Sequence, residues 1–94
     1  MTVATRSIYL RFVRRRGEVW VDVAPQHVPR DQRDWKDIET VLIALDQPND
    51  IHRPTNRSLV DAYPLLRHRL DDLRRATSEG QWALIKQRLR SAGM

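Results

Sequence analysis

The clearest pattern of apolar and polar positions lies between Ser7 and Ala24, where side chains alternate with a period of two. Both runs in this segment are rich in β-branched and aromatic residues, which is typical of strands. The apolar positions are Ile8, Leu10 and Phe12 in the first run, and Val19, Val21 and Val23 in the second. Residues 7–24 are therefore predicted to form an antiparallel β-hairpin with one apolar face.

The loop of this hairpin is predicted to be the four residues Arg14–Gly17. Gly17 can adopt the positive φ that closing a hairpin often requires. Such a loop keeps the apolar side chains on one face, because a slip of one residue would divide them between faces. The predicted register pairs Phe12 with Val19, Leu10 with Val21 and Ile8 with Val23, and it sets Arg11 across from Trp20 in a cation–π pair.

The rest of the chain has the 3.6-residue period of helices. A helix over 34–46 begins at Asp34 as its N-cap, with Asp31 as an alternative cap one turn earlier. A helix over 58–76 begins at Ser58 and is kinked or stepped at Pro64. A third helix over 79–92 follows a capping box made by Ser78 and Gln81. The apolar stripes are Trp35, Ile38, Leu42 and Leu45; Leu59, Tyr63, Leu66, Leu70 and Leu73; and Trp82, Ile85, Leu89 and Ala92.

These elements predict a single α+β domain over residues 1–94. Its order is ββααα, in which the hairpin packs against three helices and the second and third helices form an antiparallel pair. Residues 1–6 are expected to be a flexible N-terminus and residues 47–57 a long loop. The expected core residues are Phe12, Val21, Leu42, Leu66, Leu70, Trp82, Ile85 and Leu89.

The composition narrows the possible functions. The 94 residues include no cysteine, which excludes disulfides, thiolate metal sites and a cysteine nucleophile. The absence of cysteine also fits a reducing cytoplasm, which is the expected location. We expect no membrane span, because no window approaches 18 apolar residues.

The titratable residues do not form a recognisable catalytic or metal-binding pattern. His27, His52 and His68 lack the spacing of metal ligands. The acidic residues are scattered or lie at helical spacing from arginines, and the three glycines form no phosphate-binding loop. We therefore expect a protein that is not an enzyme and that has no cofactor and no bound metal.

The net charge is +5, and 15 of the 17 basic residues are arginine. Two basic clusters stand out: Arg14, Arg15 and Arg16 at the hairpin tip, and Lys86, Arg88 and Arg90 in the last helix. The clusters could bind the phosphates of a nucleic acid. Alternatively, the first is a solvated turn and the second complements the dipole at a helix C-terminus.

The outward face of the hairpin carries Tyr9, Arg11, Val13, Trp20 and Asp22. Aromatic residues beside arginine are typical of the centre of a protein–protein interface. Alternatively, a helix or a second copy of the chain covers this face as ordinary core. Because the predicted elements leave this face and both hairpin edges without a cover, a homodimer through the hairpin is also predicted.

A longer pattern carries a resemblance to a known class. The chain reads F-x-R-R-x-G-E-x-x-V-x-V-A-P over Phe12–Pro25 and W-x-D-I-E-x-V-L-x-x-L over Trp35–Leu45. This half of the chain resembles small bacterial toxin-immunity proteins. The resemblance implies a strand meander followed by helices, and a protein that acts by binding and blocking a partner.

The sequence thus favours a small non-enzymatic protein that acts through protein–protein interaction, in an inhibitor, immunity or accessory role. The alternative is an accessory protein that binds nucleic acid through the two basic clusters.

Overall fold

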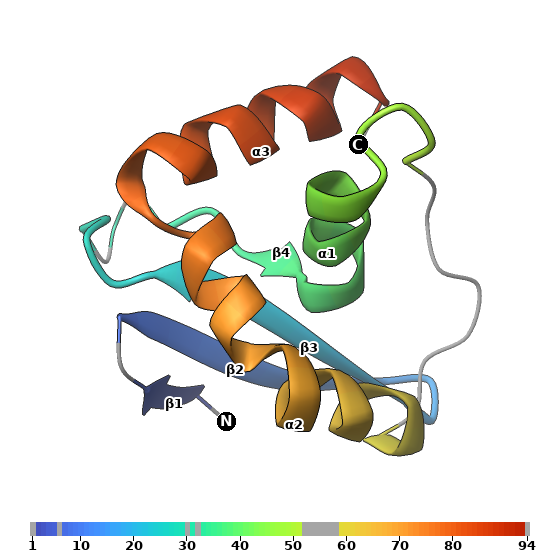
Figure 1. Ribbon diagram of the computed structural model, residues 1–94. Coiled ribbons are helices and arrows are strands. Elements are labelled where there is room, and N and C mark those ends of the chain that lie inside the picture. The colour runs from blue at the N-terminus through green and yellow to red at the C-terminus, as the bar shows by residue number, and fades with distance from the viewer. Residues whose placement is uncertain (1, 6, 30, 32, 52–58, 94) are drawn as a thin grey trace.

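The described residues of the chain fold into a four-stranded antiparallel sheet with three helices, as a computed structural model shows (Figure 1). The structure describes residues 2–5, 7–29, 31, 33–51 and 59–93, without the side chains of 15 and 59–62. The elements are β1 (Thr2–Thr5), β2 (Ile8–Arg15), β3 (Glu18–Pro25), β4 (Lys36–Asp37), α1 (Ile38–Asp46), α2 (Leu59–Ala76) and α3 (Glu79–Ser91). The α+β class is confirmed, and the sheet has two strands more than the predicted hairpin.

The first additional strand is β1, where a flexible N-terminus was predicted. Thr2–Thr5 pairs antiparallel with Ile8–Arg11, after a turn in which Ser7 has a φ of 69°. The strand covers one edge of the hairpin. Four residues are too few to show a period in the sequence, although threonine and valine favour strands.

The hairpin turn contains two residues rather than the predicted four. Arg16 and Gly17 both have positive φ, 51° and 80°, as in the primed turns that match the twist of the flanking strands. The predicted register is therefore wrong by two residues, and Arg14 and Arg15 lie in β2. The observed register pairs Leu10 with Val23, Phe12 with Val21 and Arg14 with Val19. A shift of two preserves which face each side chain occupies, so the apolar face stands as predicted.

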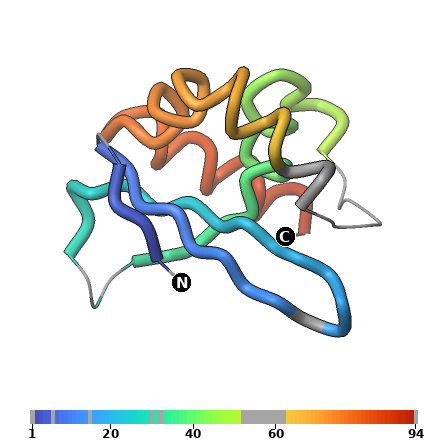
Figure 2. The backbone as a smooth tube through the Cα atoms, turned by 90° about the horizontal axis from the view of Figure 1, so that it is seen from below, coloured from blue at the N-terminus to red at the C-terminus, as the bar shows by residue number. Residues whose placement is uncertain are grey.

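The core lies between this apolar face and the three helices, which all cover the same side of the sheet (Figure 2). Five of the eight expected core residues are buried, namely Val21, Leu42, Trp82, Ile85 and Leu89. Phe12, Leu66 and Leu70 are half-buried and pack against the rim of the core. Leu73 and Ala76 have no exposed surface. The part of α2 that enters the core therefore lies about one turn nearer the C-terminus of the helix than predicted.

Helix α1 begins later than predicted, because Lys36 and Asp37 pair with the edge of β3 as strand β4. The N-cap is Asp37 rather than Asp34. A carboxylate oxygen of Asp37 accepts hydrogen bonds from the backbone N–H of Thr40 at 3.0 Å and from its hydroxyl at 3.1 Å. Asp34 instead forms an ion pair with Lys36 at 3.4 Å.

Helix α2 contains a step, as predicted, but at Arg69 rather than at Pro64. The backbone of Arg69 is non-helical, with φ −124° and ψ 17°. Its guanidinium donates to both carboxylate oxygens of Asp46 at 2.6 and 2.9 Å, and to Asp72 at 2.9 Å. These bonds join the C-terminal end of α1 to the step in α2. The predicted cap at Ser58 lies outside the described residues.

Helices α2 and α3 do not form a tight antiparallel pair. They diverge from their joint, and α1, which contacts both, lies between them (Figure 1). Ser78 begins α3 with extended backbone, but its hydroxyl donates to the carbonyl of Arg75 at 2.8 Å, so the predicted capping box does not form. The buried Thr77 hydroxyl donates to the carbonyl of Leu73 at 2.9 Å.

Truncation of Leu73 to alanine is expected to cost about 2–5 kcal/mol of unfolding free energy, because the side chain is fully buried and would leave a cavity. Leu70→Ala is the matched control, since Leu70 is half-buried on the same helix and its loss should be smaller. Urea denaturation of both variants measures the difference. An equal or larger loss for Leu70→Ala would contradict the observed placement of α2.

The ion pair of Asp46 with Arg69 is expected to make stability depend on pH. The hydrogen bond from Arg69 holds the pKa of Asp46 below its ordinary value. Because the pKa of Asp46 is lower in the folded state than in the unfolded state, the ion pair stabilises the fold at pH values above the pKa of the unfolded carboxyl group. This stabilisation is lost as the pH falls below about 4. Asp46→Asn should therefore be less stable than the wild type at pH 7, by at most about 1 kcal/mol because both groups are partly exposed.

The difference between the wild type and Asp46→Asn should disappear in acid, which thermal unfolding between pH 2 and pH 7 would test (roughly the range in which carboxyl groups titrate). Asp71→Asn is the control, because the side chain of Asp71 is 96% exposed. A difference for Asp46→Asn that stays constant with pH would contradict the assigned ion pair.

Candidate functional site

The face of the sheet opposite the helices carries the predicted partner-binding residues. We call Tyr9, Arg11, Val13, Trp20 and Asp22 the open face; all five are half-buried. Arg11 pairs directly with Asp22, and Val13 with Trp20, across β2 and β3. Figure 2 shows the three helices on the other side of these strands. The structure thus brings the predicted set together on a surface that no described helix covers.

Arg11 lies at the centre of the open face, and its partners differ from those predicted. Its guanidinium forms an ion pair with Asp22 at 2.8 Å. It also stacks on the ring of Trp35, with 4.7 Å between the guanidinium carbon and the ring centroid. The predicted stacking of Arg11 on Trp20 does not occur, because the observed register sets Val13 across from Trp20.

Residues 33–35 complete the surface, although their place there was not predicted from the sequence. The guanidinium carbon of Arg33 lies 3.9 Å from the centroid of the Tyr9 ring. Together with Trp35 and Thr2, these residues line a cleft of about 480 Å³ that also includes Arg11. Trp35 immediately precedes β4, so the pairing of β4 with β3 brings both Arg33 and Trp35 to the sheet.

The two arginines of the cleft differ electrostatically. Asp22 neutralises Arg11, whereas no carboxylate of the described residues forms an ion pair with Arg33. The Nε atoms of both arginines are buried and have no hydrogen-bond acceptor in the described part of the chain. Stacking on Tyr9 therefore holds Arg33 in place, and its positive charge is not compensated within the cleft.

The two predicted basic clusters do not combine into one surface. Arg14 and Arg16 are exposed at the end of the sheet, whereas the side chain of Arg15 is not among those that the structure describes. The second cluster is on α3, in the helical layer (Figure 1). Within this cluster, Arg88 donates to the carbonyl of Ala44 at 3.0 Å near the end of α1. Lys86 and Arg90 are then the members of the cluster that could contact a ligand.

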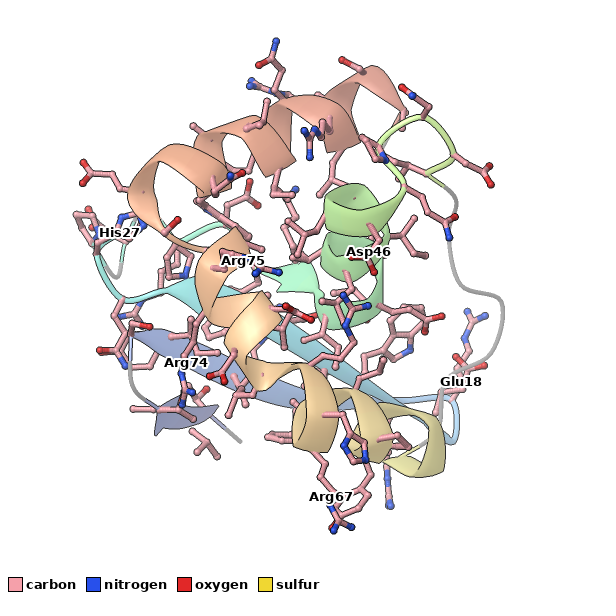
Figure 3. The ribbon with its side chains drawn as sticks, viewed as in Figure 1. Glu18, His27, Asp46, Arg67, Arg74 and Arg75 are labelled. Atoms are coloured by element: carbon pink, nitrogen blue, oxygen red, sulfur yellow. The ribbon has the colours of Figure 1, made fainter. Side chains whose placement is uncertain are left out.

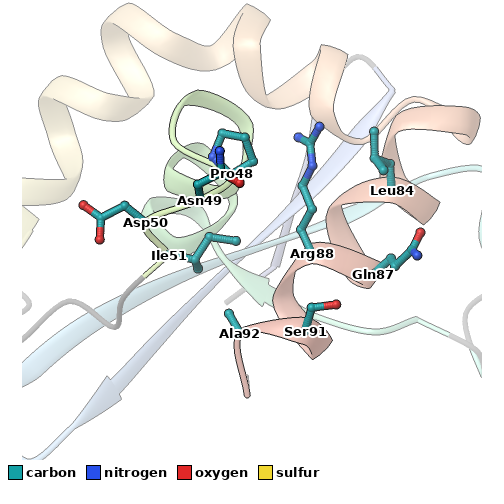
Figure 4. A pocket seen from close by; sticks show the side chains of 9 residues that line it. All are labelled: Pro48, Asn49, Asp50, Ile51, Leu84, Gln87, Arg88, Ser91 and Ala92. Carbon is teal, nitrogen blue, oxygen red and sulfur yellow. The ribbon is translucent and has the colours of Figure 1, made fainter.

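A second cleft, of about 510 Å³, lies between α3 and the segment after α1 (Figure 4). Its lining includes Pro48, Ile51, Leu84 and Arg88. The only positive group in this lining is Arg88, which already donates to Ala44.

Within the described ranges, no three histidine or acidic side chains lie close enough to hold a metal ion. Figure 3 shows His27 at the left edge of the molecule and Glu18 near the right edge, with Asp46 between them at the end of α1. The Nε2 atom of His27 lies 2.9 Å from the carbonyl oxygen of Thr77, which joins the segment after β3 to the joint before α3. His52 lies outside the described residues.

Comparisons with models of protein families, with curated proteins and with solved structures found no match to this chain. Of the helices described here, none combines the length and the apolar character that crossing a membrane requires.

Proposed function

We propose that this protein binds another protein through the open face of its sheet and the adjoining cleft. The observation that carries the proposal is a pair of arginines stacked on aromatic rings, on a face that no described helix covers. Tyrosine, tryptophan and arginine are the residues most enriched in the energetic centres of interfaces. A protein that presents such a surface is suited to act by binding a partner.

An inhibitor, immunity or accessory role in the cytoplasm is the specific form of this proposal. It draws on the resemblance of Phe12–Pro25 and Trp35–Leu45 to toxin-immunity proteins and on the absence of cysteine. A homodimer through the hairpin is a competing use of the same surface. Its premise is weakened, because β1 and β4 occupy part of both hairpin edges and residues 33–35 cover part of the face.

Binding to nucleic acid is the alternative, and the exposure of Arg14 and Arg16 at the end of the sheet favours it. Lys86 and Arg90 could add contacts on α3, but they lie in a different layer of the molecule (Figure 1). The separation of the two clusters, and the bond of Arg88 to Ala44, make this alternative the weaker of the two.

Cross-linking from the open face is expected to capture one specific partner. A photoreactive amino acid at Val13 should cross-link to a single protein in cells, and the same group at Gln87 on α3 should not. The captured protein is then identified and purified, and its affinity is measured. Trp20→Ala should weaken that affinity by a factor of about 30, the effect of losing an interface hot spot, whereas Gln87→Ala should leave it unchanged.

Equal capture from Val13 and Gln87 would contradict a role for the open face. Capture of only a second copy of the chain, with a dimer in sedimentation that Trp20→Asp disrupts, would support the homodimer instead.

Binding of short mixed-sequence DNA or RNA tests the alternative. If it is correct, retention at low salt should fall steeply as salt is added, and replacing Arg14, Arg15 and Arg16 with serine should abolish it. Serine at Arg67, Arg74 and Arg75 is the charge-matched control on α2 and should have little effect. The absence of retention by the wild type, or an equal loss in both triple variants, would exclude specific binding through the turn.

A further inference from the structure

We infer that the cleft between Tyr9 and Trp35 binds side-chain carboxylates in an acidic segment of the partner protein. Arg33 is the principal donor and Arg11 the second. The inference rests on the proposed function and specifies the chemistry of the partner. It depends on how each guanidinium is held and on where the acidic residues around the cleft lie.

Arg33 is positioned to bind a planar anion. Its guanidinium lies over the Tyr9 ring at 3.9 Å, so the ring supports one face of the group and leaves the N–H donors at its edge. The buried Nε atom of Arg33 has no hydrogen-bond acceptor among the described residues. A carboxylate matches this edge with two parallel hydrogen bonds, which are among the strongest that a neutral-pH interface forms.

Arg11 contributes less positive charge but fixes the geometry of the cleft. One Nη atom donates to Asp22 at 2.8 Å, and the Trp35 ring stacks on the guanidinium. Both constraints limit the rotamers of a long side chain, so less conformational entropy is lost when a ligand binds. Because Asp22 offsets the charge of Arg11, an anion that enters the cleft is attracted mainly to Arg33.

The arrangement favours a carboxylate over a nucleic acid. Proteins that bind single strands present aromatic faces on which bases stack. Here both rings already carry a guanidinium on one face. Asp22 lies beside the cleft, and it faces Asp37 across the pairing of β3 and β4. A continuous phosphate backbone would pass close to these acids, whereas a short acidic segment can place one or two carboxylates against the arginines alone.

The size of the cleft and the overall charge agree with an acidic partner. A volume of about 480 Å³ accommodates a few side chains. The net charge of +5 attracts an acidic surface and speeds encounter with it. Thr2, on the edge strand β1, has the smallest side chain of the lining. The cleft is therefore least obstructed by side chains on the side of β1.

Titration of the full chain with an oligoglutamate peptide tests the inference, with oligoglutamine of equal length as the neutral control. Nuclear magnetic resonance follows the Nε–H signals of Arg33 and Arg11 and the backbone amides. Oligoglutamate should shift both arginine signals and oligoglutamine should not. Arg33→Gln should weaken binding by about tenfold or more, as expected for the loss of a charge-assisted pair.

Two further variants separate specific recognition from general attraction. Arg67→Gln removes the same charge from an exposed position on α2 and should change the affinity less than twofold (roughly the effect of one screened surface charge). Arg33→Lys keeps the charge but loses the planar fork, and it should bind several times more weakly than the wild type. Unchanged backbone spectra away from the cleft verify that each variant is folded.

The inference is wrong if Arg33→Gln and Arg67→Gln weaken binding equally, because the attraction would then be diffuse. It is also wrong if inorganic phosphate or a single-stranded oligonucleotide shifts the arginine signals at lower concentration than oligoglutamate does. Absence of any oligoglutamate binding, together with a partner captured from Val13, would refute the acidic chemistry and leave the proposed function intact.

Discussion

The pairing of Lys36 and Asp37 with the edge of β3 determines how both sides of the sheet are used. The pairing fixes the direction in which the chain enters α1, and the Asp37 carboxylate completes that entry by capping the first turn. Ile38, immediately afterwards, is fully buried in the core. On the other side, the residues before β4 bring Arg33 and Trp35 to the open face. A strand of two residues is weak alone, so the cap and the burial of Ile38 must stabilise it.

The hairpin shows how far a periodic pattern can predict a fold. Alternation fixes the parity of each strand, and parity decides which face Leu10, Phe12 and Val21 occupy. It does not fix the register, because a shift of two residues satisfies the same alternation. The turn decides the register, and the arginine at positive φ before Gly17 is an unusual choice for it. The strands β1 and β4 could not be predicted, because two or four residues define no period and their pairing depends on β2 and β3.

The candidate site was predictable to the same extent. The five residues of the open face follow from the alternation, and the structure brings them together. Arg33 and Trp35 were missed because Trp35 also fits a helical stripe with Ile38 and Leu42, at spacings of three and four. Only the pairing of β4 with β3 in the folded protein shows that Trp35 precedes a strand and does not lie in a helix. The basic clusters illustrate the opposite case, since sequence proximity grouped Arg88 with Lys86 and Arg90, whereas helical geometry turns Arg88 toward Ala44.

The distribution of arginine contacts separates arginines with an internal role from those suited to binding. Arg69, Arg74 and Arg75 form ion pairs within the helical layer, and Arg88 donates to a backbone carbonyl. Such contacts give these four arginines a role within the fold without any ligand. Arg33 differs, because an aromatic ring rather than a carboxylate holds it. Stacking restricts the side chain and removes part of its hydration before a ligand arrives, yet it leaves the charge unneutralised. Binding of a carboxylate to Arg33 consequently costs less free energy for ordering and desolvating the guanidinium than binding to a fully solvated arginine would.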